Sequence, residues 1–367
     1  MPEWRLLGSD GVSAAAGLAL DEALMSSYAH GEPDRSPTLR LYTYASHCVL
    51  VGRYQDARAE VDLEACERTG TAIGRRPTGG GAIVMGAGQA GVALVDRVHG
   101  AARPKEMLER YAEGIVRGLA TLGVDATFRG KNDLECAGRK IAGLGLYLDG
   151  RGALLFHSSV LAGLDIAFML EVLRIPAAKL GDKAVAAVSE RVTTVSRETG
   201  REWCGATLRD AIARGFADAF GVAMAPAEAG PEEIALADEL ERTKYLTPDW
   251  IFQRSPQADA RGSAVFKTPA GLVRVYLALK GGAVKSVLFT GDFNELPEEL
   301  VKLESALRWT RIERVHDVVT LECPRGALGV DAGSLAGAVR AAAGRAAERE
   351  EVAVPDRDGS CYFPEVV

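Results

Sequence analysis

The sequence predicts an α+β fold divided into two units. Short runs of β-like residues, several of them separated by glycines, fill residues 39–95, and a clear amphipathic helix follows at 105–122. A second set of signals begins after residue 262, where apolar residues alternate around Gly281 and Gly282 as in a β-hairpin. Both units are therefore expected to combine strands with helices.

The spacing of apolar residues predicts the individual elements. A helix is expected near 14–29, because Leu20, Leu24 and Tyr28 recur at four-residue intervals and share one face. The other expected helices lie near 105–122, 166–173, 207–220, 297–307 and 333–348, and the expected strands of the first unit lie at 39–44, 48–52, 70–76, 81–85, 91–95, 139–149 and 152–161.

Residues 226–262 change character and separate the two units. The stretch PAEAGPEE is acidic and turn-rich, and KYLTPDWIFQRSPQADARG has two prolines and little periodicity. Trp250 and Phe252 are too apolar to remain in water, so we expect part of this segment to pack against a domain. The assigned ranges are a first domain at 1–245, a linker at 246–262 and a C-terminal accessory domain at 263–367.

Charge and composition narrow the class of protein. The formal net charge of -7 argues against a dedicated nucleic-acid binder. No stretch approaches the ~18 apolar residues that a bilayer span needs, and the N-terminal stretch lacks the pattern of a secretory signal. The six cysteines include no Cys-x-x-Cys pair, which is typical of a reducing compartment and indicates neither a zinc site nor a disulfide framework. We expect a cytoplasmic protein.

The stretch GRRPTGGGAIV, residues 74–84, places positive charge beside bare backbone. Gly79, Gly80 and Gly81 allow a ligand to approach peptide N–H groups, and consecutive N–H groups form a nest for anions. Arg75 and Arg76 add donors that suit phosphate or carboxylate. A tight turn flanked by surface arginines explains the same letters, so both interpretations stay open at this point.

A second stretch, GKNDLECAGRKIAG at 130–143, holds polar residues before a β-like run. Asn132 and Asp133 are frequent turn residues. If Ile141 points to the core, Lys140 points to the opposite face, either into water or toward a ligand. From spacing alone, the solvated interpretation is favoured.

Together, RRPTGGGAIV and NDL…GRKIAG resemble the lipoate–protein ligase family, within the biotin/lipoate ligase superfamily. LALDEALM, LLFHSSVLAGLD, KLGDKAVAAVSERVTTV and KYLTPDW resemble further segments of that family, and the resemblance covers nearly the whole chain. It implies a mixed or antiparallel β-sheet catalytic domain flanked by helices, with a smaller α+β accessory domain. It also implies that ATP and Mg²⁺ activate lipoate or octanoate as an acyl-adenylate, which then acylates a lysine of an apo lipoyl-domain protein, such as a 2-oxoacid dehydrogenase E2 subunit or a glycine-cleavage H protein.

The resemblance implies a role for each matching residue. Lys140 corresponds to the family's essential lysine, which holds the carboxylate and bridges the α-phosphate. Asp133 is also the expected Mg²⁺ ligand. The residues expected to bind the nucleotide or acyl-adenylate are Arg75, Arg76, Gly79, Gly80, Gly81, Ala82, Asn132, Asp133 and Lys183. Those expected to line the acyl pocket are Val84, Gly91, Val92, Leu94 and His157.

One departure and two alternatives accompany the resemblance. Many family members have a histidine where this chain has Met85. The first alternative is an octanoyl-acyl carrier protein-dependent octanoyltransferase, which uses a cysteine nucleophile and no ATP. One class carries that cysteine shortly before the Asn132–Asp133 turn, where this chain has none, and Cys136 comes after the motif. The second alternative is a non-catalytic protein that binds lipoate or the adenylate. The ATP-dependent ligase is the expected function.

Overall fold

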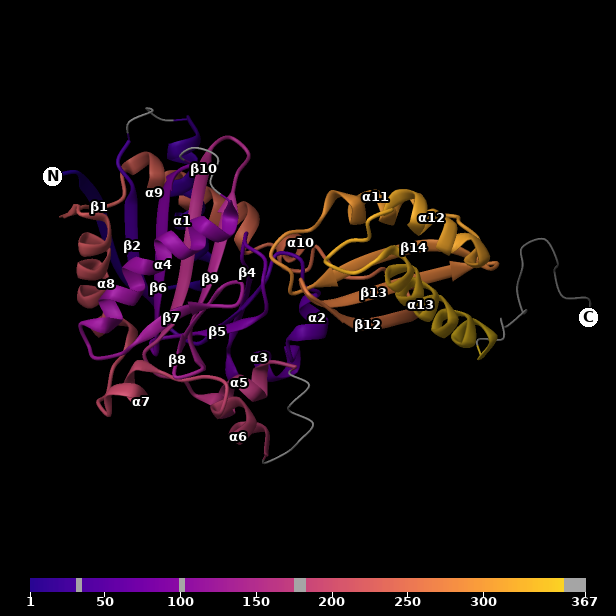
Figure 1. The fold of residues 1–367 in the computed structure, drawn as a ribbon, viewed down its shortest axis with the longest axis horizontal. Coiled ribbons are helices and arrows are strands. Elements are labelled where there is room, and N and C mark those ends of the chain that lie inside the picture. Colours follow the sequence, from indigo (N-terminus) through magenta and orange to yellow (C-terminus); the bar gives the residue numbers. More distant parts are fainter. Residues whose placement is uncertain (31–34, 99–102, 175–182, 353–367) are drawn as a thin grey trace, which may run out of the picture. The chain divides into compact units, whose positions relative to one another are not determined.

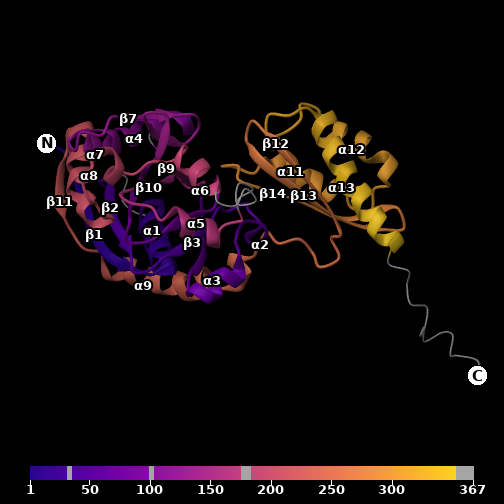
Figure 2. The same ribbon diagram turned by 90° about the horizontal axis from the view of Figure 1, so that it is seen from below.

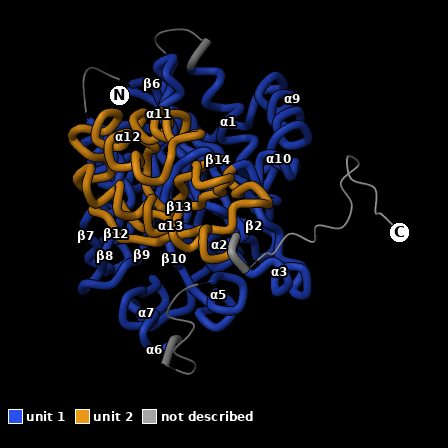
Figure 3. Tube along the Cα trace, turned by 90° about the vertical axis from the view of Figure 1, so that its right-hand side faces the viewer, with its two compact units in different colours: residues 1–253 blue, residues 254–367 orange. Residues whose placement is uncertain are grey.

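The computed structural model describes residues 1–30, 35–98, 103–174 and 183–352. Its contacts divide the chain into two compact units, Met1–Gln253 and Arg254–Val367 (Figure 3). This division falls inside the range 246–262 that the sequence assigns to a linker. Each unit has its own sheet and helices, as expected for an α+β protein.

The first unit is built on a mixed eight-stranded sheet (Figure 1). The strand order is β11-β1-β2-β6-β10-β9-β8-β7, with β1 parallel to both its neighbours and the other pairs antiparallel. The sheet therefore confirms the predicted fold class. The strands are β1 (Glu3–Val12), β2 (Thr38–Tyr44), β6 (Gln89–Arg97), β7 (Ala126–Arg129), β8 (Asp133–Cys136), β9 (Arg139–Leu148), β10 (Ala153–Leu161) and β11 (Ala223–Pro226).

Helices cover both faces of this sheet. Figure 2 shows α4 and α8 on one side of the strands and α1 with α9 on the other. The central strand β6 is consequently buried on both faces: Val92 and Leu94 enter one core, and Ala93 and Val95 enter the other. The helices are α1 (Ala14–His30), α2 (Ala57–Glu60), α3 (Leu63–Thr69), α4 (Pro104–Ala120), α5 (Ile166–Val172), α6 (Lys183–Ser189), α7 (Val195–Thr199), α8 (Gly205–Phe220), α9 (Pro231–Leu240), the π-helical η2 (Glu241–Tyr245) and α10 (Pro248–Ile251).

A small three-stranded sheet carries the arginine–glycine stretch. Its order is β4-β3-β5, formed by β3 (Cys48–Val51), β4 (Ala72–Arg75) and β5 (Ile83–Met85). Strand β3 is parallel to β4 and antiparallel to β5. The motif is therefore the connection between the two outer strands, which fixes both of its ends.

The second unit is a three-stranded antiparallel sheet packed with helices. The predicted hairpin is confirmed, and its turn residues Gly281 and Gly282 both have positive φ, 59° and 74°. The sheet order is β12-β13-β14. The elements are β12 (Gly262–Thr268), β13 (Gly271–Lys280), β14 (Ala283–Gly291), α11 (Glu298–Ala306), the 3₁₀ turn η3 (Ile312–Arg314), α12 (Val315–Glu322) and α13 (Ala332–Val352).

The segment before the unit boundary is more ordered than its composition indicates. The helices α9, η2 and α10 occupy most of it, and the side chain of Tyr245 is 1% exposed. The indole of Trp250 donates to the backbone carbonyl of Arg75 at 2.9 Å. In the described part of the chain, no helix combines the length and apolarity that crossing a membrane requires.

Candidate active site

The glycine connection between β4 and β5 is held by Arg76. Its guanidinium donates to the carbonyl oxygens of Leu50 at 2.6 Å, Gly79 at 3.2 Å and Gly81 at 2.8 Å. Gly80 has a φ of 92°, a conformation that favours glycine. The arginine therefore shapes the loop around its own side chain.

Arg76 also places a buried positive charge beside the loop. Its side chain is 5% exposed, and no ion pair involves it among the residues that the structure describes. Burial lowers the pKa of Arg76 to about 10, so it remains a cation at neutral pH. Carbonyl dipoles stabilise this charge without neutralising it, and the surroundings of Arg76 favour negative charge.

Arg75 was predicted to contact the ligand, but it does not line the pocket. It is 0% exposed and absent from the pocket wall, and its guanidinium donates to the carbonyls of Trp250 and Ile251. It also donates to the carbonyls of Gly52, Arg53 and Gln55. The expectation that Arg75 contacts the ligand is therefore corrected: it joins the end of the first unit to the turn after β3.

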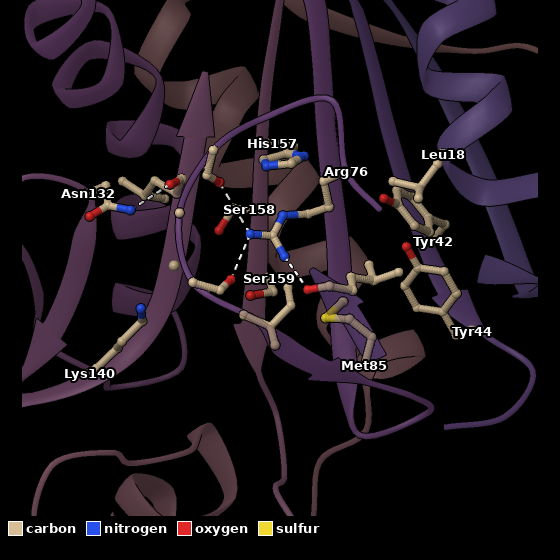
Figure 4. Close-up of a pocket in the computed structure, with 17 residues that line it drawn as sticks. Leu18, Tyr42, Tyr44, Arg76, Met85, Asn132, Lys140, His157, Ser158 and Ser159 are labelled. Carbon is tan, nitrogen blue, oxygen red and sulfur yellow. Dashed lines mark hydrogen bonds between the residues drawn. The ribbon is translucent and has the colours of Figure 1, made fainter. Parts of the chain in front are cut away.

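Next to Arg76 is a pocket with two unlike ends (Figure 4). Lys140 and Asn132 lie at one end, the side chains of Leu18, Tyr42, Tyr44 and Met85 lie at the other, and Arg76 and His157 lie between them. The remaining lining residues are Leu50, Gly79, Gly80, Gly81, Ile83, Gly143, Leu144, Ser158 and Ser159. This arrangement suits a ligand with a polar head and an apolar tail.

Lys140 provides the cation at the polar end. Its Nζ lies 2.6 Å from Oδ1 of Asp133, and its side chain is 38% exposed. A Cβ on Gly143 would lie 3.2 Å from this Nζ, so the glycine leaves room for the ammonium group above β9. The amide of Asn132 donates to the carbonyl of Leu144 at 3.2 Å, which holds the turn before β8 against β9.

His157 lies in the middle of the pocket wall as a neutral imidazole. Burial, followed by the nearby charge of Arg76, lowers the pKa of His157 to about 3. The ring shares a hydrogen bond of 2.7 Å with the hydroxyl of Thr78. A Cβ on Gly145 would lie 2.2 Å from Nε2 of His157, so only glycine fits opposite this ring. His157 therefore positions Thr78 and the glycine loop and carries no charge at neutral pH.

The low pKa of His157 predicts a loss of stability in acid. The unfolded chain binds a proton at this histidine below about pH 6.5, whereas the folded chain does so only near pH 3. The free energy of unfolding should therefore fall as the pH falls from 6.5 toward 3, by at most about 1.4 kcal/mol per pH unit for this one group. Urea unfolding at several pH values measures the slope. The His157→Gln variant should have a shallower slope, and equal slopes in the two proteins would contradict the assignment.

Tyr42 and Tyr44 line the apolar end of the pocket, and a hydrogen bond to Asp21 holds Tyr42. The hydroxyl of Tyr42 donates to Asp21 at 3.1 Å, and Asp21 forms a buried ion pair with Arg40 at 2.6 Å. The Tyr42 ring lies so close to Gly91 that a Cβ there would be 2.7 Å from it. Burial raises the pKa of both Tyr42 and Tyr44, so these walls are uncharged.

The structure brings together only some of the predicted site residues. Arg76, Gly79, Gly80, Gly81, Asn132, Lys140 and His157 line the pocket, and Asp133 contacts it through Lys140. Ala82, which follows Gly81 in the sequence, does not line the pocket. The side chain of Lys183 lies outside the described residues, although its backbone begins α6.

The predicted acyl-pocket residues other than His157 do not reach the wall. Val84 belongs to the core beneath the small sheet, and Val92 and Leu94 belong to the core under α4 and α8. Gly91 does not line the pocket, but its lack of a Cβ leaves room for the Tyr42 ring, which does. The sequence reasoning missed Leu18, Tyr42, Tyr44, Leu50, Ile83, Gly143, Leu144, Ser158 and Ser159 as lining residues. Strand alternation in HSS at 157–159 is the signal that points from His157 to Ser159, since the two residues share one face.

No cysteine among the described residues lines the pocket. Cys136 is buried, its thiol donates to Glu198 at 3.6 Å, and burial raises its pKa. Cys204 is exposed at the N-terminus of α8, and Cys361 lies outside the described residues. These positions offer no thiolate at the polar end of the pocket.

The predicted Mg²⁺ ligand Asp133 is engaged by Lys140. Its carboxylate pairs with Nζ at 2.6 Å, and within the described ranges no group of three or more potential metal-ligating side chains gathers anywhere. The carboxylate of Asp133 faces the Lys140 ammonium, and a cation in that position does not fit beside a divalent ion.

Several known proteins resemble this chain. The octanoyltransferase LipM of Kyrpidia tusciae is 32% identical over 69% of this chain and 100% of its own length. Lipoate-protein ligase A subunit 1 of Thermoplasma acidophilum is 30% identical over 64% of this chain and 90% of its own length. A solved structure of the bipartite lipoate protein ligase and its E2 lipoyl domain, also from Thermoplasma acidophilum, superposes with a TM-score of 0.62 at 29% identity, covering 69% of this chain and 96% of that one.

These relatives correct the expected function. The proteins from Kyrpidia tusciae, Symbiobacterium thermophilum and Bacillus subtilis are all named octanoyltransferases, and a transferase moves an octanoyl group that is already activated. The expectation of an ATP-dependent lipoate ligase is therefore wrong, and the octanoyltransferase alternative is better supported. The nucleotide and acyl-adenylate roles expected for the individual pocket residues stay predictions, because the names of these relatives do not test them.

The family itself is shown by a match to its catalytic domain. The lipoyl protein ligase A/B catalytic domain matches residues 13–217, more than half of the chain. The fold of the first unit, the pocket between its two sheets and the curated relatives all agree with that match. The chain is an enzyme of protein lipoylation that belongs to the lipoyl protein ligase A/B catalytic domain family.

Proposed function

We propose that this protein transfers an octanoyl group from a thioester donor, octanoyl-acyl carrier protein, to a lysine of a lipoyl-domain protein such as an E2 subunit or H protein. The observation that carries the proposal is the pocket with a cation at one end and apolar walls at the other. A medium-chain acyl group has the same division between a polar carbonyl and an apolar tail. The names of the bacterial relatives support the choice of an octanoyl group.

The polar end provides what acyl transfer requires. When an amine attacks a thioester carbonyl, negative charge develops on the carbonyl oxygen, and a fixed positive group stabilises it. The exposed part of Lys140 is placed to do this, and the unneutralised charge of Arg76 adds to the field. The carboxylate of Asp133 keeps the Lys140 ammonium directed toward the polar end.

The proposed step is a single transfer. The acceptor amine forms the C–N bond, the C–S bond breaks, and the carrier leaves as a thiol while the amine loses one proton. Because the described residues place no cysteine in the pocket, we propose direct attack by the acceptor lysine without an acyl-cysteine enzyme. Asp133 is a carboxylate at the site that can take this proton from the amine and pass it to the departing thiolate, so the carrier leaves as a thiol.

The test compares two kinds of donor with the full chain. An apo lipoyl domain is incubated with octanoyl-acyl carrier protein, or with octanoate or lipoate plus ATP and Mg²⁺, and its mass is followed. Mass gain from the thioester without ATP supports the proposal. Gain from a free acid with ATP alone, or octanoate binding with no acylation from either donor, would overturn it. The enzyme is also weighed after exposure to the thioester alone, where a stable acyl-cysteine would contradict the direct step.

Met85 is expected to limit the length of the acyl chain. It is 3% exposed and lines the apolar end of the pocket near Tyr44 (Figure 4). Met85→Ala should therefore raise kcat/KM for a decanoyl thioester relative to octanoyl by about 10-fold, since each methylene in an apolar pocket changes it by roughly 10- to 200-fold. Val84→Ala is the matched control, because Val84 faces the opposite core. An unchanged ratio in Met85→Ala would place the tail elsewhere.

A further inference from the structure

A cluster of polar side chains lies beside Lys140 without lining the pocket. We call it the Glu198 cluster, formed by Cys136, Arg139, Thr193 and Glu198. The Glu198 carboxylate accepts from Nη2 of Arg139 at 2.8 Å, from the hydroxyl of Thr193 and from the thiol of Cys136 at 3.6 Å. These donors come from the start of β9, from the segment between α6 and α7, and from the end of β8. One carboxylate thus joins three segments to α7.

The same segments fix the backbone of Lys140. Its N–H donates to the carbonyl of Arg191 at 2.9 Å, and its carbonyl accepts from the N–H of Thr193 at 2.8 Å. Residues 191–193 therefore continue the sheet beside Lys140, which bridges Val192 in parallel register. Asp133, the carboxylate that pairs with the Lys140 ammonium, lies on β8, the strand whose other end carries Cys136.

The negative charge of Glu198 is paired with the positive charge of Arg139 in this cluster. Burial alone raises the pKa of Glu198, but hydrogen bonds from Thr193 and the charge of Arg139 outweigh it, so the pKa lies below its usual value. Burial and the negative charge of Glu198 raise the pKa of Cys136, so its thiol stays protonated and able to donate. The Glu198 side chain is 14% exposed, so losing its charge would leave Arg139 beside a partner that no longer neutralises it.

We propose that Glu198 is a positioning residue for Lys140. It keeps residues 191–193 paired with β9 and keeps β8 aligned with them, and these two supports set where the Lys140 ammonium and its partner Asp133 lie. The inference rests on the proposed octanoyl transfer for its kinetic consequence. The position of Lys140 is measured separately, so the two proposals can fail independently.

The experiment compares Glu198→Gln with Glu198→Asp and with Glu202→Gln. The last makes the same chemical change on an exposed side chain four residues later. Each full-length variant is assayed for octanoyl transfer, for the rate at which an amine-reactive acetylating reagent modifies Lys140, and for the rate at which a disulfide reagent modifies Cys136. Mass spectrometry of the digested protein assigns both modified sites.

Glu198→Gln should lower kcat by up to about 100-fold with little change in KM, because small misplacements of a catalytic group have effects of that size. It should also change the labelling rate of Lys140 and speed that of Cys136. Glu198→Asp should recover part of kcat, and Glu202→Gln should match the parent protein. A folded Glu198→Gln protein with parental Lys140 labelling and kcat would overturn the proposal.

A milder variant covers the case in which Glu198→Gln does not fold. Thr193→Val removes one donor to Glu198 while keeping the side-chain shape, and Thr193 is 1% exposed. Altered Lys140 labelling in this variant supports the positioning role, and parental labelling overturns it. If the parent protein transfers no octanoyl group but Glu198→Gln still alters Lys140 labelling, the proposed function fails and the positioning role stands.

Discussion

Replacing Lys140 by alanine is expected to lower octanoyl transfer by about 10²- to 10³-fold, the usual effect of removing one group that stabilises the oxyanion. The side chain lines the polar end of the pocket, and Asp133 holds its ammonium at 2.6 Å. The loss should appear in kcat more than in KM, because the interaction strengthens as charge develops on the carbonyl oxygen. The measurement is steady-state acylation of an apo lipoyl domain.

Lys131→Ala is the matched control for this variant. Lys131 is exposed, lies in the same 130–143 stretch and is absent from the pocket wall. It should keep the parental rate, which separates the position of Lys140 from the general effect of one lost positive charge. If Lys140→Ala transferred octanoyl groups at the parental rate, the pocket described here would not be the site of reaction.

Replacing Gly52 by alanine is expected to displace the glycine loop. A Cβ at this position would lie 1.9 Å from the carbonyl oxygen of Gly80 and 3.3 Å from the carbonyl carbon of Gly79, and both contacts are with backbone. The variant should lose about 1 to 3 kcal/mol of unfolding free energy, as overpacked interiors do. It should lose transfer activity as well, because Gly79, Gly80 and Gly81 line the pocket. Urea unfolding and the transfer assay measure the two effects.

Gly8→Ala provides the comparison. A Cβ on Gly8 would lie 3.5 Å from the nearest atom, the end of the Arg209 side chain, which is an ordinary contact. Stability and activity close to those of the parent are therefore expected. Parental activity in Gly52→Ala would show that the loop can shift without affecting the reaction, which would contradict a role of the loop in the site.

Much of the fold was predictable because most elements carry a strong local pattern. The amphipathic period of α4 and the alternation across the β13–β14 hairpin both identify elements that the structure confirms. Strand β1 was not predicted, because glycines and polar residues interrupt its LLGSDGV run. It forms through its neighbours instead, since β2 and β11 pair with it on its two sides.

The site was less predictable, for a geometric reason. Lys140 and the three glycines were identifiable from their motifs. The apolar end was not, because Leu18 comes from α1, Tyr42 and Tyr44 from β2, and Met85 from β5. Val92 and Leu94 looked equally suitable by composition, yet the parity of β6 turns them toward the α4–α8 core. Only the three-dimensional arrangement decides which apolar residues face the ligand.

The two neighbouring arginines illustrate the same limit. Arg75 is the last residue of β4, whereas Arg76 is the first residue of the loop that follows. The sequence assigned both charges to a ligand; both guanidinium groups donate to backbone carbonyls, and only Arg76 also lines the pocket. An arginine beside glycines can therefore hold a loop by donating to the carbonyls of that loop, and it can equally bind an anion.

The buried guanidinium of Arg75 determines how short this domain can be made. It donates to the carbonyls of Trp250 and Ile251, whereas the family match ends at residue 217. A shortened gene that stops at the family boundary would remove these acceptors and expose a charged group that the fold has enclosed. The same cut would remove Tyr245, which is 1% exposed and belongs to a hydrophobic core of the first unit. Expression of the first unit alone therefore requires a chain that continues at least through Ile251.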